Sequence, residues 1–143
     1  NRIGLIPFSP LASGLLSGKY DINSRFSEDD QRARTGDDAL LLFRKEWRGQ
    51  ALQVVKRIKP IAVKYERSIA QVAINWLIGR PAVSSVTSGA KNQNQILENI
   101  GSVGWKLSKD DLATIESVSH DFTDKLPNHL HYFMKMIGTN TTV

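Results

Sequence analysis

The sequence contains no cysteine, which excludes disulfide bonds, thiolate metal ligands and thiol nucleophiles. It lacks an initiator methionine, and it lacks the basic start, apolar stretch and small-residue cleavage site of a secretory signal peptide. No apolar run approaches the roughly 20 residues that a membrane-spanning helix needs. We therefore expect a cytoplasmic protein with no membrane partner, and the start at Asn1 favours a segment of something longer.

Charge is not concentrated enough to indicate a nucleic-acid partner. The 19 Lys and Arg residues exceed the 14 Asp and Glu residues, giving a net charge of +5. The tightest basic group, Lys56, Arg57 and Lys59, falls on the predicted solvent face of a helix. No aromatic stacking pattern accompanies it, so we expect no nucleic-acid binding.

Apolar periodicity predicts an α/β segment. Two short β-rich runs, 3–8 and 83–87, are separated by a long loop and strongly helical sequence, which is typical of two parallel strands with a crossover. Helical intervals predict helices over 47–66, 68–80, 92–101 and 108–118. Pro60 removes an amide and should kink or divide the first of these, so we expect two consecutive helical pieces there.

Polar signals mark two of the helix starts. Ser68 with Gln71 forms a capping-box pair, and Ser108 with Asp111 resembles one. Two parallel strands cannot form a stable open sheet, because an all-parallel sheet needs helices on both faces or closure into a barrel. We therefore expect the missing strands to come from outside this chain.

Two segments have no sustained period. The charge-mixed stretch 20–45 is too long for an ordinary connector, and such loops are usually functional lids or disordered. The tail 121–143 contains enough apolar residues to pack somewhere. His129 and His131 in this tail lack carboxylate partners, so we predict surface groups and no metal site.

The first candidate site follows the run 3–8. A strand that ends in Ser9-Pro10 leaves a hydroxyl and free amides at its carboxyl end, where parallel α/β folds bind their ligands. Gly14 and Gly18 permit close backbone approach, and Lys19 could reach a phosphate. A polar turn leading into a surface loop is the alternative.

The second candidate site follows the run 83–87. Gly89 leads into a helix amino terminus, where unpaired amides and the positive end of the dipole suit an anion. Lys91 beside that terminus is disfavoured by about 0.3–1 kcal/mol unless an anion lies between them. The alternative is that Lys91 extends into water. Glu98 and Asn99, one turn beyond Gln95, could pair with an adenine edge.

The order of these motifs resembles the C-terminal half of an aldo-keto reductase, over about residues 3–118. The matching stretches are IPFSPLASGLLSGKY at 6–20, AQVAINWL at 70–77, SGAK at 88–91, QILENIG at 95–101 and the Leu-Ser start of a last helix at 107–108. Within that family the sequence most resembles the potassium-channel β-subunits and related bacterial reductases. The conjunction in this order is specific, although no single motif is.

This resemblance implies the C-terminal part of a TIM (β/α)8 barrel, incomplete by itself, with 3–8 and 83–87 as its seventh and eighth strands. The whole chain, 1–143, is then one segment of a single barrel domain, in which 20–45 covers the cofactor and 121–143 is the C-terminal tail. It also implies NADP(H) bound in an extended form and a small carbonyl substrate.

The family's cofactor-binding positions carry over onto both candidate sites. The nicotinamide and pyrophosphate side corresponds to Phe8, Ser9, Pro10, Leu11, Ala12, Ser13 and Lys19, with Arg25 on the loop over the pyrophosphate. The 2′-phosphate corresponds to Gly89, Ala90 and Lys91, and the adenosine end to Gln95, Glu98 and Asn99. Lys91 stands where the family commonly has Arg, which keeps the charge but loses bidentate contact. Residues 92–94 also depart from the family's usual Pro and Glu.

The family's catalytic Asp, Tyr, Lys and His fall on earlier strands, so the resemblance places no catalytic residue in this chain. It implies an NADP(H)-dependent oxidoreductase that reduces aldehydes or ketones by hydride transfer, with this segment alone inactive. The first alternative is a non-catalytic nucleotide-binding regulatory subunit. The second is a truncated product that folds only with the missing half or with another copy.

Overall fold

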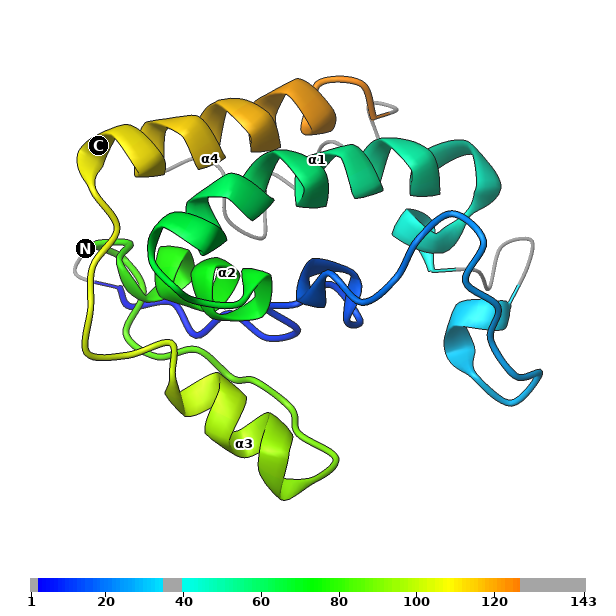
Figure 1. The fold of residues 1–143 in the computed structure, drawn as a ribbon, viewed down its shortest axis with the longest axis horizontal. Coiled ribbons are helices and arrows are strands. Elements are labelled where there is room, and N and C mark those ends of the chain that lie inside the picture. Colours follow the sequence, from blue (N-terminus) through cyan, green and yellow to red (C-terminus); the bar gives the residue numbers. More distant parts are fainter. Residues whose placement is uncertain (1–2, 35–39, 127–143) are drawn as a thin grey trace.

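The computed structural model describes residues 3–34 and 40–126, and its core is built from helices (Figure 1). The long helix α1 (Lys45–Lys64) lies beside α4 (Lys109–Thr123) and contacts α2 (Ile69–Ile78). The short helix α3 (Gln93–Ile100) contacts α2. Short 3-10 helices at η1 (Leu15–Ser17), η2 (Gln31–Ala33) and η4 (Leu41–Phe43) precede α1 in the described residues.

The predicted strands 3–8 and 83–87 lie side by side, but they do not form strands in the described part of the chain. They meet at two isolated parallel bridges, Leu5 with Val83 and Phe8 with Thr87. The backbone amide of Leu5 donates to Ala82 (2.7 Å), and the amide of Thr87 donates to Pro7 (2.9 Å). Pro7 has no N–H of its own to continue a ladder, which limits regular pairing between the two runs.

The predicted division of the first helix is wrong, because α1 continues through Pro60. Proline removes only the bond from its own nitrogen to the carbonyl four residues earlier, that of Lys56. Both Lys56 and Pro60 are exposed, so water can solvate that carbonyl. Buried residues on both sides of the proline, such as Val55 and Ile61, pack into the core and hold the helix together.

Two hydrophobic clusters stabilise this arrangement. One centres on Leu15, Val55 and Phe122, and the other on Ile58, Val72 and Ile115. Most of their members come from η1, α1, α2 and α4, so each of the three longer helices packs one apolar face into the core. These three helices therefore form the scaffold against which the loops before α1 pack.

The predicted helix caps are confirmed at α2 and half confirmed at α4. Gln71 and Ser68 exchange two bonds of 3.1 Å, the reciprocal pattern of a capping box. At α4 the Ser108 hydroxyl accepts from the Asp111 amide (3.2 Å). The amide of Ser108 instead donates to the Tyr65 hydroxyl (2.8 Å), and the Asp111 carboxylate accepts from the Tyr65 and Ser108 hydroxyls (both 2.6 Å).

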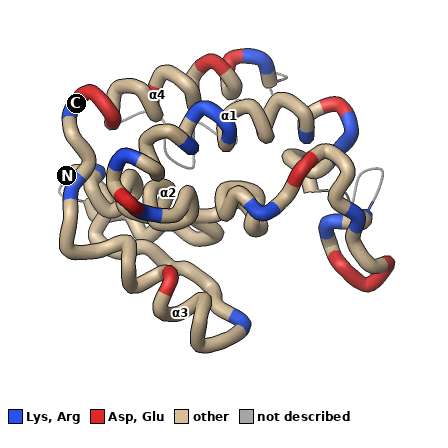
Figure 2. The backbone as a smooth tube through the Cα atoms, viewed as in Figure 1, with Lys and Arg blue, Asp and Glu red and all other residues tan. Residues whose placement is uncertain are grey.

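The helix α3 buries none of its residues among the described part of the chain. Its apolar side chains Ile96, Leu97 and Ile100 are 50–60% exposed. The run 3–8 is similarly uncovered, since Ile3 and Phe8 are 72% and 68% exposed. Lys and Arg residues and Asp and Glu residues are both spread along the described backbone, with neither sign confined to one element (Figure 2).

Candidate functional site

A cleft of about 560 Å³ lies where the segments that follow the two bridged runs face each other. One wall is the turn after 3–8 with Lys19, and the other is 88–91 with α3. The residue Ala70 of α2 and the turn η2 complete the lining. The lining residues are Ser9, Pro10, Leu11, Ser13, Gly14, Ser17, Lys19, Gln31, Arg32, Ala70, Ser88, Gly89, Ala90, Lys91, Gln95, Glu98 and Asn99.

This one cleft brings together both candidate sites of the sequence, which are about 80 positions apart in the chain. All of the predicted positions line it except Phe8, Ala12 and Arg25. Phe8 lines an apolar hollow of about 220 Å³ against α1, α2 and α4, and Arg25 is exposed outside the cleft. The cleft also contains Gln31 and Arg32, which sequence reasoning missed.

The first wall is a turn with an unusual backbone. Three non-glycine residues have positive φ, namely Ser9 (52°), Ala12 (48°) and Ser13 (56°), and Gly14 follows at 91°. Left-handed conformations at residues with a Cβ are strained and persist only where surrounding contacts hold them. Backbone bonds such as Ala12 to Ser9 (2.9 Å) tighten the turn. The strain lies where a parallel α/β fold places its ligand.

The second wall is organised by side chains around the start of α3. The Asn92 side chain caps the helix by accepting from the Gln95 amide (3.0 Å), and Gln95 accepts from the Lys91 amide (2.7 Å). Asn99 donates to the Gly89 carbonyl (3.3 Å). The backbone amides of Gln95 and Lys91 are therefore already paired within the protein, and the exposed Lys91 ammonium adds a positive charge to this wall.

The glycine Gly89 leaves open space in this wall. A Cβ built on it would meet no atom within 4 Å, and its φ is not in the left-handed region. Neither backbone strain nor packing among the described residues therefore requires glycine at this position. A ligand that approaches the backbone closely is one reason for a glycine there.

The helix α3 is held against α2 by polar side chains rather than by a buried face. The buried amide of Asn75 donates to the carbonyls of Ser102 (2.9 Å) and Trp105 (3.0 Å), just beyond α3. The Gln71 side chain donates to the Glu98 carbonyl (3.1 Å). The second wall of the cleft thus depends on two amide side chains of α2.

A cluster of charge and aromatic rings closes the cleft on the side of η2. The Arg32 guanidinium bonds both carboxylate oxygens of Asp30, the Tyr20 hydroxyl and the Ser13 carbonyl. These bonds from Arg32 hold the pKa of Asp30 at about 2, with a smaller contribution from Lys91. Asp30 therefore stays ionised at neutral pH. Sequence reasoning missed Arg32 because the stretch 20–45 has mixed charge and no hydrophobic periodicity. Without periodicity, the sequence does not indicate which side chains point toward the cleft.

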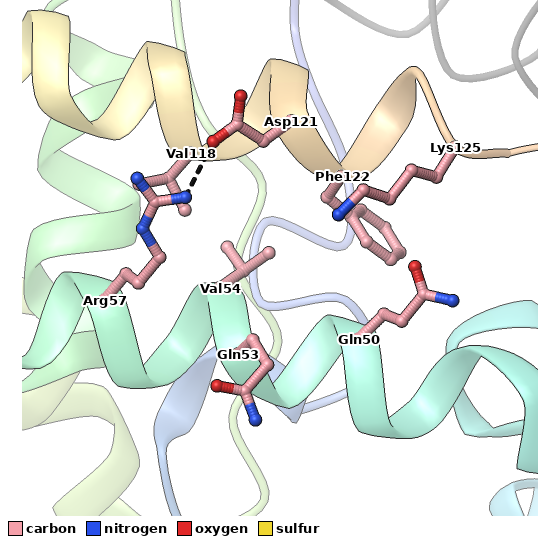
Figure 3. A pocket seen from close by; sticks show the side chains of 8 residues that line it. All are labelled: Gln50, Gln53, Val54, Arg57, Val118, Asp121, Phe122 and Lys125. Carbon is pink, nitrogen blue, oxygen red and sulfur yellow. Dashed lines mark hydrogen bonds and ion pairs between the residues drawn. The ribbon is translucent and has the colours of Figure 1, made fainter.

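The apolar hollow beside Phe8 and a small pocket between α1 and α4 lack a comparable set of polar and charged groups. Between α1 and α4 lies a pocket of about 90 Å³, spanned by the Arg57–Asp121 ion pair (2.7 Å) (Figure 3). Both of those side chains are about half exposed, so the pair contributes little. Residues 3–34 and 40–126 contain no group of three or more His, Asp or Glu side chains that could hold a metal ion. Within the same residues, no helix is both long enough and apolar enough to cross a membrane. His129 and His131 lie outside the described residues.

Comparisons with known proteins agree with the motifs. A family model described as "Aldo/keto reductase family" matches residues 1–120. A probable voltage-gated potassium channel subunit beta of Oryza sativa is 39% identical over 103 residues, covering 68% of this chain and 29% of that protein. An L-glyceraldehyde 3-phosphate reductase of Escherichia coli is 34% identical over 117 residues, covering 81% of this chain and 33% of that protein. The chain thus spans about a third of the length of these relatives.

A solved structure shows the same arrangement of elements. A glycerol dehydrogenase from Gluconobacter oxydans superposes with a TM-score of 0.73 at 20% identity, covering 87% of this chain and 36% of that one. At this identity the likeness concerns the fold alone: most of this chain has the fold of about a third of that larger protein.

Proposed function

The chain belongs to the aldo/keto reductase family, and on that premise we propose that it is the cofactor-binding part of an NADP(H)-dependent oxidoreductase that reduces aldehydes or ketones to alcohols. The observation that carries the proposal is the single cleft in which the turn after 3–8 faces 88–91 and α3. Its volume of about 560 Å³ is suited to a ligand of nucleotide size.

The groups that line the cleft fit an elongated anionic ligand. Lys19 on one wall and Lys91 on the other supply two exposed cations for phosphates. We assign Lys91 with Gly89 and Ala90 to the 2′-phosphate, and Gln95, Glu98 and Asn99 to the adenosine end. The nicotinamide and pyrophosphate are assigned to the turn formed by Ser9, Pro10, Leu11 and Ser13, with Lys19. NADPH, when bound, would supply the hydride for the reduction.

In this proposal the chain contributes to catalysis by orienting the nucleotide, and it does not supply the group that transfers the proton. The cleft residues would fix the nucleotide at its two ends, so that the nicotinamide is held at the end of the run 3–8. We propose that the proton donor and its partners belong to the remainder of a TIM (β/α)8 barrel, of which 3–8 and 83–87 form the last two strands. The uncovered side chains of Ile3, Phe8 and α3 support this, because that remainder would bury them.

A test of the cofactor assignment compares NADPH with NADH in the complete protein. Lys91→Ala should weaken NADPH by about tenfold, because one charge-assisted phosphate contact is lost, and should leave NADH nearly unchanged. Lys106→Ala, which removes an exposed lysine outside the cleft, is the matched control. Equal weakening of both nucleotides by Lys91→Ala would show that Lys91 does not read the 2′-phosphate.

A nucleotide-binding regulatory subunit is the second candidate, favoured by the relative from Oryza sativa that carries a channel-subunit name. The two proposals differ in turnover. Reduction of a small aldehyde by the complete protein, lost on substitution of its barrel tyrosine, supports the enzyme; nucleotide binding without turnover supports the regulator. If the chain instead acts as a truncated product, its exposed Ile3 and Phe8 should make it associate with the missing half or with another copy, which sedimentation would detect.

A further inference from the structure

We propose that Arg32 is a positioning residue of this cleft, which ties the loop 20–34 to the strained turn 9–14 and so fixes the wall that the nucleotide meets. The inference rests on the proposed nucleotide-binding function. It concerns a residue that neither the motifs nor the family resemblance singled out.

The hydrogen bonds of Arg32 show that its side chain links the loop 20–34 to the turn 9–14 and is not free to bind a ligand. A guanidinium has five N–H donors in a fixed fork. In Arg32, Nε donates to Asp30 Oδ1 (2.7 Å) and Nη2 to Asp30 Oδ2. Nη1 donates to the Tyr20 hydroxyl and to the Ser13 carbonyl (3.5 Å). Most of its donors are therefore engaged within the protein before any phosphate arrives.

The loop that Arg32 belongs to is anchored on the helical scaffold. The rings of Tyr20, Phe26 and Phe43 contact one another edge to face, with centroids 5.2–5.9 Å apart. Arg48 of α1 donates to two loop carbonyls at 2.7 and 2.8 Å. Arg32 lies over the rings of Tyr20 (5.2 Å) and Phe26 (5.1 Å). Arg32 thus joins an anchored loop to the turn that lines the cleft.

The strained turn 9–14 requires contacts that keep its backbone in place. Ala12 and Ser13 have left-handed backbone conformations that cost energy, and each persists only where neighbouring contacts determine it. Arg32 binds the carbonyl of Ser13, and a Cβ on Gly14 would lie 3.3 Å from the Tyr20 ring and 3.7 Å from Arg32 Nη1. Arg32 and Tyr20 therefore lie against the turn at Ser13 and Gly14, where they limit movement of its backbone.

Arg32 differs from the loop arginine that the family resemblance indicates. Arg25 is exposed and does not line the cleft, whereas Arg32 lines it with a side chain only 17% exposed. The loop of this chain is thus fixed to the nucleotide cleft through Arg32. Loss of the tie should act mainly on how long a bound nucleotide is retained, since a loosened wall lowers the barrier to release.

The experiment measures NADPH affinity and release rate in the complete protein by stopped-flow fluorescence, for the wild type and five variants. Arg32→Ala should weaken binding by about tenfold, mostly through faster release. Arg32→Lys should fail to restore it, because an ammonium is a point charge that cannot span three partners in one plane. Tyr20→Phe should show a smaller loss, and the double variant Arg32→Ala/Tyr20→Phe should lose less than the sum of the two single losses. Arg34→Ala removes an exposed arginine of the same loop and should match the wild type.

The outcomes separate this inference from the proposed function. If the wild type binds neither NADPH nor NADH, the proposed function fails. If the wild type binds NADPH, and Arg32→Ala and Tyr20→Phe release it as slowly as the wild type does, Arg32 does not position the wall of the cleft. Full rescue by Arg32→Lys would also overturn the inference, because it would mean that charge alone matters. Should Arg32→Ala fail to fold, Tyr20→Phe and Arg32→Lys decide the question by the same criteria.

Discussion

The carboxylate of Asp111 offers a quantitative test of how α1 and α4 are joined. Its Oδ2 accepts from Lys64 Nζ (2.8 Å), the Ser108 hydroxyl (2.6 Å) and the Tyr65 hydroxyl (2.6 Å). These bonds, with Lys64 the largest contributor, lower the pKa of Asp111 from 3.8 to about 2. We expect Asp111→Asn to destabilise the fold at neutral pH, because an amide cannot replace an ionised acceptor of three donors.

The magnitude follows from the pKa. Each unit of difference between the folded and unfolded pKa is worth about 1.4 kcal/mol, so a folded pKa near 2 gives an upper limit of roughly 2.5 kcal/mol. Lys64 is 57% exposed while Asp111 is 12% exposed, so water screens part of the lysine contribution. We therefore expect a loss of about 1–2 kcal/mol for Asp111→Asn at pH 7.

The pH dependence has a definite sign. Because the folded pKa lies below the unfolded one, the stabilisation is fully present above about pH 4 and disappears as the pH falls toward 2. Urea unfolding followed by tryptophan fluorescence measures the difference between wild type and variant at each pH. Asp110→Asn is the matched control, since Asp110 is an exposed neighbour in the same first turn of α4. A difference that stays constant from pH 5 to pH 2.5, or no difference at pH 7, would refute the reasoning.

Two further substitutions test the supports of the cleft. Asn75→Ala should cost about 2 kcal/mol of unfolding free energy, because the carbonyls of Ser102 and Trp105 lose their donor, and it should also weaken nucleotide binding by displacing α3. Asn94→Ala, at an exposed position of α3, is its control, and equal urea midpoints for the two variants would contradict the role of Asn75. Gly18→Ala should cost about 1 kcal/mol or more, since Gly18 has a φ of 75° and a new Cβ would lie 2.6 Å from the Ile69 side chain. Gly89→Ala should leave the urea midpoint unchanged, because its Cβ has room; a larger loss for Gly89→Ala than for Gly18→Ala would contradict this account of the two turns.

The helices were predictable because local signals determine them. The Ser68–Gln71 pair caps α2 as expected, and the predicted helices form with apolar residues such as Val55 and Ile115 buried on one face. The continuity of α1 through Pro60 was not predictable, because it depends on core packing on both sides of the proline and on water reaching the carbonyl of Lys56. The regular strands expected at 3–8 and 83–87 do not form. Among the described residues the two runs pair only with each other, and no further strand lies on the outer side of either run.

The cleft was predictable only in the parts that carry local motifs. The glycine and serine pattern of 9–14 and the turn at 88–91 could be recognised in the sequence, and the structure brings the two together. Arg32 could not be recognised, because its role depends on contacts with Tyr20 and Ser13, which lie 12 and 19 positions away. The hydrogen bond from the Lys91 amide to the Gln95 side chain could not be predicted either, because it depends on the backbone conformation of the turn that leads into α3.

The central claim, that the cleft between the turn 9–14 and residues 88–91 holds NADP(H), is tested most directly by a crystal structure of the complete protein with NADP+. The account predicts the 2′-phosphate beside Lys91 and the nicotinamide at the end of the run 3–8, with Arg32 still bonded to Asp30 and Tyr20. Density for the nucleotide at any other place on the protein, with this cleft filled only by water, would contradict it.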